Sequence, residues 1–139
     1  QSPSSAASDV YKRQQEQHHL DTFENLINEY QTRPSVLTPL WNGAGFMLGA
    51  VTAAMGPKAA MACTIAVEEV IGEHYREQAE TLDDSEAELR ATLRQFRDEE
   101  LEHRDTAIDH DGEDAVGYPV LRQIISTGCR TAIKLAEKI

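Results

Sequence analysis

Hydrophobic residues recur three and four positions apart along most of the chain, which is the spacing of one face of an α-helix. The clearest run lies within residues 85–110, where a single stripe holds Leu89, Leu93, Phe96, Glu100, His103, Ala107 and His110. Similar runs cover residues 16–30 and 119–138, and the stripe of the second run holds Leu121, Ile124, Ile125, Gly128, Ala132 and Leu135. No alternating pattern of the kind that strands show competes with them, so the sequence predicts an all-α fold.

Turn and capping residues divide this pattern into helices. Pro34 disfavours a helical conformation for the residue before it, so the first helix should end near Thr32. Pro57 follows a glycine and suits the first position of a new helix, which we expect to run to about residue 80. Ser85 and Glu88 have the spacing of a capping box, with Ser85 as N-cap of the next helix.

Residues 35–67 form an apolar segment whose single charge is Lys58. Pro39 and the Gly56-Pro57 pair interrupt it, whereas a membrane span needs about 20 unbroken apolar residues. The segment therefore predicts either an apolar helix that lies in a membrane face or a helix buried in the protein core.

Residues 1–14, rich in Ser and Ala, carry no helical stripe and differ in character from the rest of the chain. We expect them to form a tail, disordered or foreign to the protein, ahead of one domain over residues 15–139. The formal net charge of −11 repels nucleic acid, so nucleic-acid binding is not expected. Cys63 and Cys129 are not in a CxxC pair and are expected to be small buried residues.

The residues that can carry chemistry are two Glu-x-x-His units and one further glutamate. Glu16–His19 and Glu100–His103 each place a carboxylate and an imidazole one turn apart on an apolar stripe. Glu68 follows a long stretch with few charges, where an acid without a partner is costly. Di-iron carboxylate bundles use two such motifs and two single glutamates, and this donor set suits iron or manganese. The competing interpretation places these charges on a solvated helix face.

Four stretches of the chain resemble the demethoxyubiquinone hydroxylase family of coenzyme Q biosynthesis. They are RPSVLTPLWNGAGFMLGA, GPKAAMACTIAVEE, FRDEELEHRD and GCRTAIKLAEKI, and the resemblance covers about residues 15–139. It implies a ferritin-like helical bundle that holds two iron ions, with Glu16, His19, Glu68, Glu100 and His103 as ligands. His74 and Tyr75 match the His-Tyr pair of the family, which implies that they assist electron or proton transfer near the quinone.

Family members open with a further helix that bears a DHAGE-type motif and the remaining glutamate ligand. No such motif precedes Gln15 here, so we expect an incomplete bundle that by itself binds iron poorly.

The activity that the resemblance implies is hydroxylation of the demethoxyubiquinol ring, with dioxygen as co-substrate. Residues 36–55 are expected to contact a membrane surface, which places the protein peripherally on an inner membrane, on the bacterial cytoplasmic side or the mitochondrial matrix side. A partner protein of quinone synthesis is also implied. Two alternatives remain: a ferritin-like protein that handles iron or peroxide without quinone chemistry, and a helical interaction module without catalysis.

Overall fold

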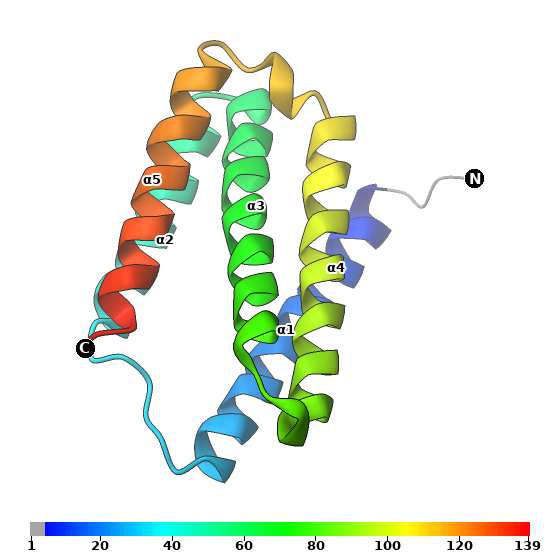
Figure 1. Cartoon of the computed structure of the whole chain (residues 1–139). Coiled ribbons are helices and arrows are strands. Elements are labelled where there is room, and N and C mark those ends of the chain that lie inside the picture. The colour runs from blue at the N-terminus through cyan, green and yellow to red at the C-terminus, as the bar shows by residue number, and fades with distance from the viewer. Residues whose placement is uncertain (1–4) are drawn as a thin grey trace. The chain divides into compact units, whose positions relative to one another are not determined.

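The computed structural model describes residues 5–139, which divide into two compact units at the boundary between Pro34 and Ser35. Each unit is described by itself. Residues 5–139 form five α-helices and two short 3₁₀ helices and contain no strand (Figure 1). The predicted all-α fold is therefore confirmed.

The first unit contains one long helix, α1 (Ser5–Glu29). We expected residues 1–14 to form a tail, disordered or foreign to the protein, and the structure places residues 5–14 in the first turns of α1. The physical reason is that no glycine or proline follows Pro3 before the predicted helix, and Ala6 and Ala7 favour helix. Residues 1–4 lie outside the described residues. Gln31 adopts a left-handed backbone (φ 49°) just beyond α1, close to the predicted end.

The second unit is a helical bundle built around α3 (Pro57–Thr81). The other three helices, α2 (Thr38–Ala54), α4 (Ala87–Asp109) and α5 (Tyr118–Ala136), all contact α3, and α3 lies between α4 and α5 in Figure 1. Gly56 has a positive φ of 116° and Pro57 begins α3, as the sequence predicted. These contacts leave α3 as the element that positions any site in this unit.

The connection from α3 to α4 differs from the predicted capping box. Asp83, not Ser85, is the capping residue, since its carboxylate accepts a hydrogen bond of 2.9 Å from the Ser85 backbone N–H. A 3₁₀ turn, η1 (Asp84–Glu86), then precedes α4. The Asp83 carboxylate thus takes the Ser85 backbone N–H, the donor that a capping box would give to the Glu88 side chain.

The connection from α4 to α5 passes through a second 3₁₀ turn, η2 (Gly112–Asp114), which packs against α3. A Cβ at Gly112 would lie 2.5 Å from Ile65 Cδ1 and 2.9 Å from the Ala107 carbonyl oxygen. Only glycine fits this position without a shift of its neighbours. The close approach fixes where α4 ends relative to α3.

The core of the second unit is buried between α3, α4 and α5. Its largest fully buried side chains are Phe96, Ile65, Glu100 and Val70. Cys63 and Ala66 of α3 form a buried cluster with Ile125 of α5. Both cysteines are free thiols. Burial of a charged residue, Glu100, among apolar side chains is the feature of this core that calls for a chemical explanation.

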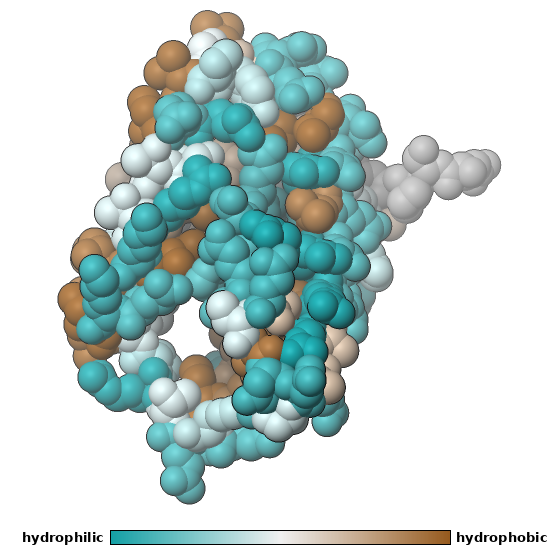
Figure 2. Space-filling model, in the orientation of Figure 1, coloured by the Kyte–Doolittle hydropathy of each residue, from teal (hydrophilic) through white to brown (hydrophobic). Residues whose placement is uncertain are grey.

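Most of the apolar surface of α2 faces outward. Phe46 is 76% exposed and Leu40 is 60% exposed, and Thr52 is the buried residue of this helix. On α5, Val120 and Ile124 are each 65% exposed, although Ile124 was expected on the inner stripe. Figure 2 shows apolar residues along the edge that α2 and α5 form. Residues 36–55 are thus not a buried core helix, and no helix within residues 5–139 is long and apolar enough to cross a membrane.

Candidate metal centre

Three of the predicted ligands meet between α3 and α4. Glu68 of α3 and Glu100 and His103 of α4 are all buried, and each offers a ligand atom within 4.8 Å of the others. Glu100 and His103 lie on the stripe that also buries Leu93 and Phe96. The apolar pattern of α4 therefore brings a carboxylate and an imidazole inward together with the core, rather than onto a solvated face.

The donor atoms of this cluster suit a divalent metal ion. The Nδ1 atom of His103 lies 3.3 Å from Oε2 of Glu100, and Glu68 adds a second carboxylate. Two carboxylates in an apolar interior repel each other and are costly to desolvate. A cation bound between them removes both costs, and oxygen and imidazole donors together match iron or manganese. The residues present thus fit the metal that the sequence implied.

Glu16 and His19 belong to the other unit. They lie one turn apart on the same face of α1, so each can reach an ion at that face. Their approach to Glu68, Glu100 and His103 stays a prediction.

His74 and Tyr75 are neighbours on α3 but have different surroundings. His74 lines a cavity of about 220 Å³ together with Val70 and Ile133, and its Nδ1 lies 3.9 Å from Oε1 of Glu137, just beyond α5. The Tyr75 ring packs at 6.2 Å from the ring of Phe96 on α4. The two side chains therefore connect α3 to different helices. Glu137 was not found from the sequence, because an exposed glutamate near the end of a helix gives no signal there.

The two thiols near the centre are held in their protonated form. Burial raises the pKa of Cys63, and a hydrogen bond with Thr52 opposes this in part. Burial also raises the pKa of Cys129. A thiol with a raised pKa is a poor metal ligand and nucleophile at neutral pH. The cysteines therefore serve as apolar packing groups, and the carboxylates and imidazoles carry the chemistry.

Comparison with known proteins identifies the family of this chain. Residues 6–136 match the family described as "Ubiquinone biosynthesis protein COQ7". The chain is 51% identical over 128 residues to the "NADPH-dependent 3-demethoxyubiquinone 3-hydroxylase, mitochondrial" of Mus musculus, which covers 89% of the chain and 59% of that protein. It is 48% identical over 125 residues to the "3-demethoxyubiquinol 3-hydroxylase" of Rhodospirillum rubrum, covering 90% of the chain and 59% of that protein.

A third relative, the "5-demethoxyubiquinone hydroxylase, mitochondrial" of Saccharomyces cerevisiae, is 48% identical over 140 residues, covering 90% of the chain and 60% of that protein. The chain spans about three-fifths of the length of these curated relatives. The family match extends over nearly all of the described chain, and the predicted resemblance is confirmed: this protein belongs to the ubiquinone biosynthesis protein COQ7 family.

Proposed function

We propose that this chain is part of a 3-demethoxyubiquinol 3-hydroxylase, which inserts an oxygen atom from dioxygen into the quinol ring. The observation that carries the proposal is the buried cluster of Glu68, Glu100 and His103. It occurs in a chain about half identical to proteins named for that hydroxylation. The donor set supplies what the reaction needs, a place for redox-active metal in the protein interior.

Glu16, His19, Glu68, Glu100 and His103 would hold two iron ions. Bound iron supplies the one-electron chemistry that allows dioxygen to react with a closed-shell ring. The protein contributes the position and the protonation of the groups around it. Phe96 is four positions before Glu100 in sequence, and Val70 is two positions after Glu68. Both side chains are almost fully buried, so they exclude water from the interior of the bundle.

His74 and Tyr75 are proposed to move protons and to orient the quinol. His74 lies in the cavity with Val70 and Ile133, which offer an apolar contact for a ring or the start of an isoprenoid tail. Oε1 of Glu137 lies 3.9 Å from Nδ1 of His74, which places a carboxylate beside the imidazole at the edge of this cavity. The Tyr75 ring is fixed against Phe96, one turn before Glu100. The pair thus joins a solvent-accessible cavity to the helix that carries two ligands.

The exposed apolar face of α2 and α5 is proposed to rest on a membrane surface. Phe46, Met47 and Val51 of α2 are each more than half exposed, and the quinol substrate, whose tail is a long hydrocarbon, resides in a bilayer. Burial of this face in the interfacial layer stabilises a peripheral position without a span. Inner membranes, on the mitochondrial matrix side or the bacterial cytoplasmic side, are the proposed location. A lipid-binding protein of quinone synthesis is the proposed partner.

The same exposed face separates the two ferritin-like functions. A protein that handles iron or peroxide has no use for an apolar entry surface. Burial of residues 36–54 inside the bundle would therefore have favoured that alternative. The segment is largely exposed, which supports the hydroxylase.

The test is product analysis with the intact natural protein, loaded with Fe²⁺ and supplied with demethoxyubiquinol, dioxygen and NADPH. The proposal expects a product one oxygen atom heavier, detected by mass spectrometry. Glu100→Gln should abolish the product, whereas Glu102→Gln, on the exposed side of the same helix, should retain it. Iron oxidation or peroxide consumption without any hydroxylated quinol would contradict the proposal and favour the alternative.

A further inference from the structure

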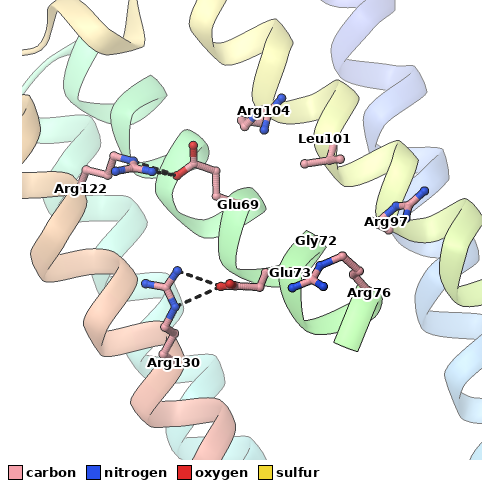
Figure 3. Close-up of a pocket in the computed structure, with 9 residues that line it drawn as sticks. All are labelled: Glu69, Gly72, Glu73, Arg76, Arg97, Leu101, Arg104, Arg122 and Arg130. Atoms are coloured by element: carbon pink, nitrogen blue, oxygen red, sulfur yellow. Dashed lines mark hydrogen bonds and ion pairs between the residues drawn. The ribbon is translucent and has the colours of Figure 1, made fainter. Parts of the chain in front are cut away.

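Five arginines surround a groove on the face of the second unit where α3, α4 and α5 meet. The groove encloses about 330 Å³, within the size range of small-molecule sites. Figure 3 shows that the arginines come from all three helices. They are Arg76, Arg97, Arg104, Arg122 and Arg130.

This concentration of positive charge is unusual for the chain. The sequence has 13 Lys and Arg residues against 24 Asp and Glu, yet five of those 13 line one groove whose acidic lining is only Glu69 and Glu73. Glu69 pairs with Arg122 at 2.6 Å and Glu73 with Arg130 at 2.9 Å. The other three arginines pair with acids that lie outside the lining, and Arg76 does so with Glu80 at 3.1 Å.

Arg97 and Arg104 are held only by acids outside the lining. Each pairs at 2.6 Å with the aspartate that comes directly after it in sequence, and consecutive residues on a helix do not share a face. Exposed pairs of this kind contribute little, at about 0–1 kcal/mol. Both guanidinium groups can therefore turn toward an anion in the groove at small cost.

The long side chains of these two arginines can both reach one anion in the groove. They lie seven residues apart on α4, about 10 Å along the helix axis, with Leu101 between them. Gly72 of α3 lines the groove beside Leu101, where a Cβ would make an ordinary van der Waals contact of 3.4 Å with Leu101 Cδ2. Guanidinium groups bind phosphate oxygens in a bidentate manner. We propose that this arginine groove binds a water-soluble ligand through two linked phosphate groups.

A lipid headgroup could supply the same phosphate chemistry, but the geometry of α5 disfavours it. Val120 and Ile124, two residues on either side of Arg122, are 65% exposed and belong to the apolar face. Positions two residues apart on a helix differ by about 200°. Arg122 and the groove therefore point away from the face proposed to meet a membrane.

The inference uses none of the metal ligands, so it stands or falls separately from the hydroxylase proposal.

The test is isothermal titration of the intact natural protein with inorganic pyrophosphate at fixed ionic strength. We expect saturable binding that Arg104→Gln weakens about tenfold, since one charge-assisted pair is lost. Arg94→Gln is the matched control, because Arg94 is exposed on the same helix and lies outside the groove. Its affinity should stay within about twofold of the wild type. Circular dichroism checks the fold, and Arg97→Gln replaces Arg104→Gln if the latter misfolds.

Sedimentation with vesicles of phosphatidylcholine and phosphatidylserine tests the other source of phosphate. The proposal expects the Arg104→Gln and wild-type proteins to bind these vesicles equally. Absence of pyrophosphate binding, or equal weakening by Arg94→Gln, would overturn it. So would vesicle binding that depends on Arg104, which would assign the groove to a lipid headgroup.

Discussion

Replacement of Glu100 by glutamine should stabilise the metal-free protein. The nearest ligand atoms of Glu68 and Glu100 lie within 4.8 Å of each other, so two negative charges there repel by about 3.5 kcal/mol at an effective dielectric constant of about 20. Both side chains are buried, Glu100 to 2% exposure, so solvent screens this repulsion poorly. Structural relaxation and the cost of burying the new amide both reduce this effect. We expect the remainder, a gain of about 1–3 kcal/mol in the free energy of unfolding.

Urea denaturation followed by circular dichroism measures this gain, in the presence of EDTA and at pH 8. Glu102→Gln, at an exposed position of the same helix, should change stability by less than about 0.5 kcal/mol. With Mn²⁺ added, the wild type should gain more stability than Glu100→Gln. A loss of stability in the metal-free variant would refute the reasoning that crowded carboxylates occupy this core.

Three further predictions concern packing and the apolar face. Phe96→Ala should lower the free energy of unfolding by about 3–5 kcal/mol in urea denaturation, because the ring is 1% exposed; a loss below about 1 kcal/mol would contradict this packing. Gly112→Ala should cost about 1–3 kcal/mol by the same assay, since its Cβ would meet Ile65 and the Ala107 carbonyl; unchanged stability would show that the turn is looser. Phe46→Ser should weaken sedimentation with phosphatidylcholine vesicles and leave the unfolding midpoint unchanged, because Phe46 is 76% exposed; unaltered sedimentation would exclude this residue from a membrane contact.

The helices of the second unit were predictable because local rules and core packing agree there. Pro57 begins α3 as expected, since glycine before it takes a backbone that other residues avoid and proline suits the first turn. The stripe through Phe96, Glu100 and His103 is buried as its spacing predicted. Periodicity identifies such residues because the buried face of a helix repeats every 3.6 positions whether its side chains are apolar or ligating.

The structure differs from the sequence-based predictions where two local signals competed, or where tertiary contacts determined which residues are buried. Asp83 rather than Ser85 caps the turn before α4, and both are good capping residues, so spacing alone chose wrongly. Residues 5–14 are helical because propensity suffices without an apolar stripe. The stripe of α5 placed Ile124 inward, but it is exposed, since a surface that packs on no neighbour can be as apolar as a core.

Part of the candidate site required the structure. The approach of Glu68 to Glu100 and His103 depends on the register of α3 against α4, which no pattern in one helix encodes. Glu137 beside His74 and the arginines that line one groove come from helices far apart in sequence. Contacts between helices that are far apart in sequence cannot be predicted from the periodicity of one helix. Within its own helix, each of these residues occupies an ordinary surface position.

The proposal that Glu16 and Glu68 are both metal ligands is the central claim, and Mn²⁺ affinity tests it most directly. Titration of the intact natural protein, followed by electron paramagnetic resonance of free Mn²⁺, compares Glu16→Ala with Glu68→Ala and with the exposed-site control Glu102→Ala. Loss of even an outer-shell partner commonly costs about 10–100-fold in metal affinity, so both ligand variants should bind at least about tenfold more weakly than the wild type, and the control should not. Unchanged affinity in Glu16→Ala would contradict the account, because α1 would then contribute no ligand to the centre.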